Sequence, residues 1–254
     1  MNRLFVLTLF MVGVLLSGVK SGEAGGSLFR LGYLEHTGAA LCRIAQLKGE
    51  YAQEGLKVEL VRFSDSRSGL AALEQGTIHA GAFEVGEGLK AIAGGKGFRI
   101  IAGGGIPTAT GPLAELDDRV QQRLDLSGIV ILIPATGGAG EKETLTRLTA
   151  ALVRAYRSSR AEPELLRSKS VGTDQPIIHF DPYPDYYRLE RLWKRLDLHS
   201  STFPPDFLAN HVYEEIYCDA LDRLLDSAPD DNVYKELSGK AVCVPDCCPK
   251  NKKQ

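Results

Sequence analysis

The sequence lacks an excess of positive charge. Its 254 residues carry 30 Lys and Arg against 32 Asp and Glu, which gives a formal net charge of −2. Proteins that bind nucleic acid by neutralising phosphates need a basic excess, so no nucleic-acid partner is expected. Apolar residues make up 44% of the chain, enough to build a sizeable core, and this excludes a disordered or collagen-like protein.

The common catalytic and metal-binding motifs are also missing. The chain contains no G-x-S-x-G elbow and no H-E-x-x-H, and its five histidines never occur at i, i+4 spacing. The segment Gly137-Gly138-Ala139-Gly140-Glu141-Lys142 resembles a phosphate loop, but Glu141 interrupts the required Gly-Lys-Ser/Thr and adds negative charge. No acid, base and nucleophile are grouped either, so the sequence predicts neither an enzyme nor a resident metal or cofactor.

No apolar run is long enough to cross a bilayer. The longest, from Leu4 to Leu16, has about 13 residues, whereas a spanning helix needs roughly 20. Arg3 precedes this run and small residues follow it, which is the pattern of an export signal cleaved near Ala24. A retained anchor is the alternative. The sequence therefore predicts an exported protein, periplasmic if the source is Gram-negative.

Five cysteines lie beyond this signal, in what would then be an oxidising compartment where disulfides persist. Cys42 falls within a helical pattern with no Cys-His signature, so we expect an inert core residue. The C-x3-C-C cluster near the end has no nearby His and fits zinc spacings poorly, which favours disulfides over metal. The disulfide candidates are Cys218, Cys243, Cys247 and Cys248.

Strand-like and helix-like segments alternate from residue 27 to residue 105, as in a parallel sheet with crossover helices. Strands are predicted at 28–34, 56–63, 77–85, 98–102 and 129–134, and helices at 38–54, 66–76, 88–95 and 143–157. A small helical piece is expected around 113–124, and 164–168 can continue the helix before it. The last third is predicted to be helical, at 186–196, 205–225 and 232–237.

Polar residues beside glycines follow each of the first strands. In open parallel sheets small ligands bind at the carboxyl ends of the strands, where loops and helix N-termini meet. Arg67 would pair with an anionic group, whereas Glu35 and Glu84 favour an amine; helix capping and surface ion pairs are the alternatives. The candidate ligand contacts are Glu35, His36, Thr37, Ser66, Arg67, Ser68, Glu84 and Gly86.

Several phrases of the chain resemble the nitrate/sulfonate/taurine and thiamine-precursor class of periplasmic substrate-binding proteins. The resemblance rests on Leu31-Gly32-Tyr33-Leu34, on residues 54–60 (EGLKVEL), 69–76 (GLAALEQG) and 77–81 (TIHAG), and more loosely on 148–156 and 185–198. It implies an α/β fold: the parallel-sheet first lobe of a type II periplasmic-binding-protein fold, followed by a helical C-terminal third.

The chain departs from that class in one respect. Only about twenty residues separate Gly105 from Leu126, where members of the class build a second lobe, so the second lobe must be reduced. Two-lobed binders enclose a ligand by hinge closure. A single lobe covers only one side of a ligand. A partner protein or a second copy of the chain could cover the other side; otherwise the protein binds its ligand weakly or serves another task.

These observations predict a signal peptide at 1–24, a single α/β substrate-binding-like domain at 25–240 and a Cys-rich tail at 241–254. The resemblance implies the periplasmic component of an ABC transporter, which hands a small polar organic molecule or anion to a permease. The alternative is an accessory or interaction protein of the cell envelope. A set of aromatic residues favours it as a docking patch, although aromatic residues at helical spacing usually belong to the core: Tyr183, Tyr186, Tyr187, Trp193, Phe203, Phe207, Tyr213 and Tyr217.

Overall fold

The computed structural model describes residues 28–34, 40–104, 108–109, 128–135, 139–167, 178–179, 182–198 and 203–240. The predicted signal peptide, the helical piece at 113–124 and the Cys-rich tail lie outside the described residues. Among the described helices, none is both long and apolar enough to cross a membrane.

Five strands form the central sheet in the order β2-β1-β3-β6-β4. β1 pairs in parallel with β2 and β3, as the alternating pattern predicts. β6 instead runs antiparallel to both β3 and β4, between which it is inserted. Its run of apolar residues fits a strand buried on both faces in either direction, so the sequence could not reveal this reversal. The strands are β1 (Phe29–Leu34), β2 (Val58–Phe63), β3 (Ala80–Glu84), β4 (Phe98–Gly103) and β6 (Ile129–Pro134).

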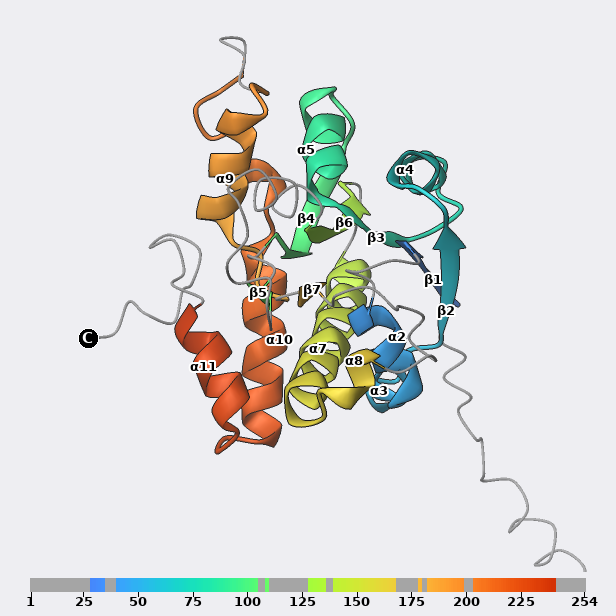
Figure 1. Cartoon of the computed structure of the whole chain (residues 1–254), viewed down its shortest axis with the longest axis vertical. Helices are drawn as coiled ribbons and strands as arrows, with labels where there is room; N and C mark the ends of the chain where they lie inside the picture. The colour runs from blue at the N-terminus through green and yellow to red at the C-terminus, as the bar shows by residue number, and fades with distance from the viewer. Residues whose placement is uncertain are drawn as a thin grey trace, which may run out of the picture.

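Helices flank this sheet. Figure 1 shows α4 and α5 above the strands and α2, α7 and α10 below them. A separate two-stranded ladder pairs β5 (Thr108–Ala109) with β7 (Ile178–His179) in antiparallel fashion. The helices are α2 (Ala40–Leu47), α3 (Glu50–Gln53), α4 (Ser66–Glu74), α5 (Val85–Ala93), α7 (Ala139–Ala161), α8 (Glu164–Arg167), α9 (Tyr186–Arg195), α10 (Glu214–Ser227) and α11 (Asn232–Lys240).

Two predicted helices are shorter than their patterns suggested. The helix predicted at 38–54 is divided into α2 and α3 at Gly49, whose φ of 71° lies in the left-handed region that glycine adopts without strain. The helix predicted at 205–225 begins only at Glu214. Before it, a 3-10 turn (Ala209–His211) leads into Val212, which bridges to Ile100 of β4, and the Tyr213 amide donates to the Ile100 carbonyl.

A phenylalanine surrounded by glycines holds α4 against the sheet. Phe83 on β3 is fully buried. A Cβ atom on Gly69 of α4 would lie 2.1 Å from Cε1 of Phe83, and one on Gly81 would lie 2.0 Å from Cε2. The missing side chains therefore create the space that this ring fills, which fixes the start of α4 beside the end of β3.

Candidate functional site

Two helices begin where two strands on either side of β1 end. α4 follows β2 and α5 follows β3 directly. Asp65 caps α4, since its carboxylate accepts a hydrogen bond from the Ser68 amide at 2.8 Å, while the Ser68 hydroxyl donates to the Asp65 carbonyl at 3.0 Å. The Ser68 amide and the Ser64 hydroxyl lower the pKa of Asp65 because both bonds favour the ionised carboxylate.

Ser66 and Glu84 join the starts of these two helices. The Ser66 side chain, in a residue only 4% exposed, donates from its hydroxyl to Oε2 of Glu84 at 3.3 Å. The same hydroxyl oxygen accepts a hydrogen bond from the Glu84 amide at 3.2 Å. Glu84 is the residue immediately before α5, and its side chain makes no capping bond to that helix. A hydroxyl and a carboxylate thus lie together at the N-termini of α4 and α5, where the helix dipoles favour negative charge.

The other predicted contacts are placed differently. Ser68 is engaged in the cap of α4, and Gly86 is buried in the first turn of α5. Arg67 is exposed and lines another hollow, of about 360 Å³, between α4 and α5 together with Glu87 and Lys90. Glu35, His36 and Thr37 lie outside the described residues. Of the eight predicted contacts, the structure shows a direct bond between Ser66 and Glu84.

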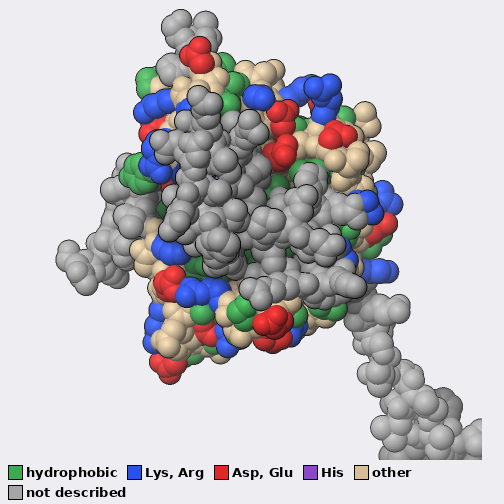
Figure 2. All heavy atoms as spheres, in the orientation of Figure 1, with side chains coloured by type: hydrophobic (Ala, Val, Ile, Leu, Met, Phe, Trp, Pro, Cys, Tyr) green, Lys and Arg blue, Asp and Glu red, His purple; other side chains and the backbone are tan. Residues whose placement is uncertain are grey.

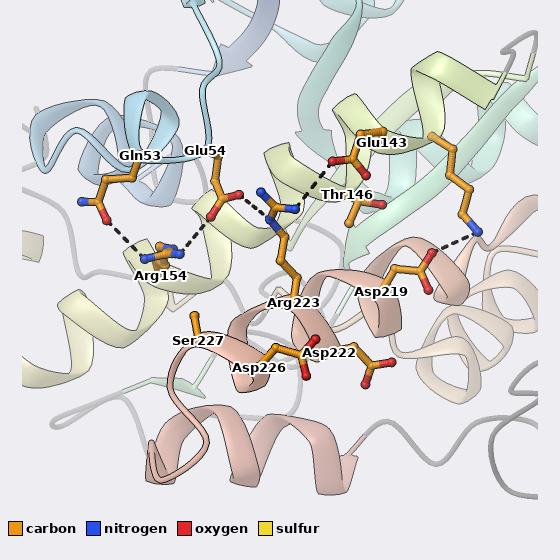
Figure 3. A pocket seen from close by; sticks show the side chains of 11 residues that line it. Gln53, Glu54, Glu143, Thr146, Arg154, Asp219, Asp222, Arg223, Asp226 and Ser227 are labelled. Atoms are coloured by element: carbon orange, nitrogen blue, oxygen red, sulfur yellow. Dashed lines mark hydrogen bonds and ion pairs between the residues drawn. The ribbon is translucent and has the colours of Figure 1, made fainter.

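A larger polar hollow lies elsewhere, at the junction of α3, α7 and α10, and measures about 820 Å³. Its centre is Glu54, whose side chain is only 2% exposed and which pairs with Arg154 at 3.0 Å and with Arg223 at 2.8 Å (Figure 3). Sequence reasoning missed this cluster. Its members come from three distant segments, and nothing in their local spacing signals that they meet.

The predicted role of Cys218 in a disulfide stays a prediction, because its proposed partners lie outside the described residues. The structure places Cys218 on α10, where it is partly exposed, and Cys42 in α2, within the core. Burial raises the pKa of the Cys42 thiol to about 12. Cys243, Cys247 and Cys248 lie outside the described residues, so pairing among them stays a prediction. No group of three or more metal-binding side chains is found in the described part of the chain.

The aromatic residues of the predicted docking patch are mostly half-buried against the core. Trp193 and Tyr217 are buried, and the rings of Phe203 and Phe207 stack with their centroids 4.2 Å apart beside Trp193. Tyr187 is the member that is exposed as a large hydrophobic side chain. Most of these aromatic side chains therefore contribute to the packing of α9, α10 and the segment between them, as the core alternative predicts.

Comparison with known proteins identifies the fold. No protein-family model and no curated protein matches the chain. Among solved structures, the nitrate-binding protein NrtA of Synechocystis PCC 6803 matches with a TM-score of 0.57 at 14% identity, covering 82% of this chain and 91% of that one. The zinc-bound ligand-binding component of an ABC-type import system from Staphylococcus aureus gives 0.56 at 12%, covering 76% and 98%.

A third match is the Candida albicans CA3427 product, described as defining a new family with the generic periplasmic-binding-protein fold. Its TM-score is 0.54 at 9% identity, covering 74% of this chain and 96% of that one. The chain therefore adopts the periplasmic-binding-protein fold, as the sequence resemblance implies. Its described residues form one five-stranded lobe and the short β5–β7 ladder, which agrees with a reduced second lobe.

Proposed function

We propose that the chain is the substrate-binding component of an ABC import system, which binds a small polar molecule without chemical change and delivers it to a permease. Two of the matched structures are described as binding components, one for nitrate and one from an ABC-type import system. The observation that carries the proposal is the bond between Ser66 and Glu84, because it joins two helix N-termini at the sheet edge where α/β folds bind ligands.

The polar groups at this junction indicate which class of ligand it can bind. Glu84 offers carboxylate oxygens, which accept hydrogen bonds from an amine or a hydroxyl group. The first N–H groups of a helix have no partner within that helix, so those at the start of α5 that remain unbonded can donate to a polar or anionic group. A small organic molecule with both kinds of group satisfies the junction, and Glu35, His36 and Thr37 are proposed to complete the site from the loop after β1.

The location of the protein and the surface that would cover the other side of the ligand are also part of this proposal. We propose that residues 1–24 direct export and are removed near Ala24, so that the mature protein is periplasmic if the source is Gram-negative. Because burial of a small ligand needs surface on more than one side, we propose that the permease or a second copy of the chain supplies the opposite wall.

A thermal-shift screen with small polar compounds tests this function. A compound that binds the native state raises its melting temperature. We expect the shift to be lost in Glu84→Gln and Ser66→Ala and retained in Glu74→Gln, an exposed glutamate at the end of α4 that pairs with Lys96. If no compound stabilises the wild type, or if Glu74→Gln loses the shift as fully as Glu84→Gln, the proposed site is wrong.

A further inference from the structure

A small hollow of about 220 Å³ lies where β4, β6, α7 and α10 meet. It is at the opposite edge of the sheet from the junction of Ser66 and Glu84. Glu84 stands opposite Ile129, the first residue of β6, whereas Ile133 and Pro134 at the end of that strand line the hollow. Figure 1 shows α7 and α10 both beginning beside the sheet and running away from it, so their first turns form the other walls.

An arginine that has no ion pair lines this hollow. Arg99 of β4 is partly buried, and its guanidinium is stacked on the ring of Tyr213, with 4.2 Å between its Cζ atom and the ring centroid. The Tyr213 amide donates to the Ile100 carbonyl at 2.8 Å, so the ring and the guanidinium belong to two segments that are bonded together. No described residue forms a hydrogen bond or an ion pair with this guanidinium. A planar, stacked guanidinium with unbonded N–H groups is suited to bind a carboxylate through two hydrogen bonds.

A carboxylate that has no ion pair lines the same hollow. Glu141, in the first turn of α7, makes no hydrogen bond or ion pair within the described part of the chain, whereas Lys142 and Glu215 beside it bind each other at 2.5 Å. On the face shown in Figure 2, the described basic and acidic side chains lie interspersed. Arg99 and Glu141 differ from that arrangement, because they line one hollow with opposite charges and yet do not pair. The space between them therefore suits a molecule that carries both charges.

The remaining wall of the hollow is mostly apolar. Leu145 of α7, Ile216 of α10 and Ile133 of β6 are all buried residues that line it. An apolar group of a ligand gains stability by leaving water for such a surface. The volume of the hollow lies below the range of about 300–1,000 Å³ for sites that hold drug-sized ligands, so its ligand must be small.

We propose that this hollow is a second binding site, which takes a small α-amino acid with an aliphatic side chain. The carboxylate of the amino acid accepts two hydrogen bonds from Arg99, its ammonium group pairs with Glu141, and its side chain packs against Leu145 and Ile216. This site does not use Ser66 or Glu84 and does not depend on the function proposed for them.

Isothermal titration of the full chain with L-leucine at pH 7 tests the site. We expect saturable binding near one equivalent, weakened at least about tenfold by Arg99→Gln and by Glu141→Gln, because each change removes a charge-assisted contact. Arg99→Lys keeps the charge but loses the planar fork, so it should weaken binding as well. The melting temperature of each unliganded variant shows whether it is folded.

Two substitutions outside the hollow are the matched controls. Arg191 and Glu164 are exposed, and neither forms an ion pair with another described residue. Arg191→Gln and Glu164→Gln should therefore change the affinity for leucine less than twofold.

Two analogues of leucine assign its charged groups. Isocaproate is leucine without the amino group, and isoamylamine is leucine without the carboxylate, so each should bind the wild type at least about tenfold more weakly than leucine. Isocaproate has no ammonium group for Glu141 to bind, so Glu141→Gln should not weaken its binding. Arg99→Gln should likewise leave the binding of isoamylamine unchanged.

Four results would overturn the proposal. Absence of saturable leucine binding would mean that the hollow does not hold such an amino acid. Equal affinity of the wild type for leucine and isocaproate would show a simple anion site. Equal weakening by Arg99→Gln and Arg191→Gln would show general attraction to surface charge. Loss of leucine binding in Glu84→Gln but not in Arg99→Gln would place leucine at the junction of Ser66 and Glu84, which would support the proposed function and not this second site.

Discussion

The carboxylate of Glu54 lies 2.8 Å from Nε of Arg223, although 169 residues separate them in the chain. Arg154 holds the other carboxylate oxygen at 3.0 Å. α3, α7 and α10 are thereby joined through one nearly buried acid. The ion pair between Glu54 and Arg223 therefore connects α3, which precedes β2, to α10, near the end of the domain.

Replacing Glu54 tests how much this junction contributes. Glu54→Gln leaves two guanidinium groups without their carboxylate, and breaking a fully buried pair costs about 3–5 kcal/mol. Since Arg154 and Arg223 are 26% and 43% exposed, we expect a smaller loss, about 2 kcal/mol, in urea unfolding. Glu59→Gln, which removes an exposed pair with Arg30, should cost less than about 1 kcal/mol. Equal losses would mean that the Glu54 pair is no stronger than a surface pair.

A methyl group at Gly69 should disrupt the packing of α4 on the sheet. Its Cβ would lie 2.1 Å from Cε1 of Phe83 and 2.3 Å from Cζ, so the buried ring or the helix must move. We expect Gly69→Ala to destabilise by about 1–3 kcal/mol. Gly239→Ala in α11 meets nothing within 4 Å and should be neutral or stabilise by up to about 1 kcal/mol. Chemical denaturation of both variants measures the change in the free energy of unfolding. If Gly69→Ala leaves that free energy unchanged, the described packing of Phe83 on α4 is wrong.

The stability of the protein should depend on the charge of Glu214. Burial, and then the nearby carboxylate of Asp185, raise the pKa of Glu214 above its ordinary value of 4.5, while a hydrogen bond from Tyr183 partly opposes the change. The folded state then holds this proton more tightly than the unfolded state, so stability falls as pH rises from about 4.5 through the folded-state pKa.

Glu214→Gln should remove this part of the pH dependence and leave the variant more stable than the wild type at pH 7. Urea unfolding at several pH values between 4 and 8 measures the difference. Glu215→Gln is a suitable control because Glu215 is its exposed neighbour on α10. A Glu214→Gln profile parallel to that of the wild type would contradict the assignment.

In the reduced protein, the thiols of Cys42 and Cys218 should react at very different rates. Cys42 is buried and its raised pKa, about 12, leaves almost no thiolate at pH 8, whereas Cys218 is partly exposed. We expect a disulfide reagent to modify Cys218 in the native protein and Cys42 only after unfolding. Cys42→Ser and Cys218→Ser assign the two signals. Rapid native modification of Cys42 would mean that the core around it opens readily.

The elements of the fold could be predicted because their signals are local. The alternating residues of β2 and the capping Asp65 of α4 identify themselves within a few positions. The reversal of β6 and the late start of α10 could not be read in this way. Both depend on pairing with β4, through the strand register and through the bridge between Val212 and Ile100, which no local period encodes.

The candidate site, too, could be predicted only in part from the sequence. The meeting of Ser66 and Glu84 was predictable because Ser66 comes shortly after β2, Glu84 ends β3, and the carboxyl ends of parallel strands lie at one edge of the sheet. The direction of Arg67 was not, since it depends on the way the helix start turns its side chain toward the hollow beside α5. The cluster around Glu54 joins residues of α3, α7 and α10, which lie side by side only in the complete fold, so no sequence motif predicts it.

Hydrogen exchange, measured with and without a stabilising small molecule, tests the central claim most directly. If the ligand binds at the junction of Ser66 and Glu84, amides in the first turns of α4 and α5 should exchange more slowly, because the ligand covers both helix starts. Amides of α10 should exchange as before. Protection confined to α10, or spread evenly over the chain, would contradict a ligand site at the carboxyl edge of the sheet.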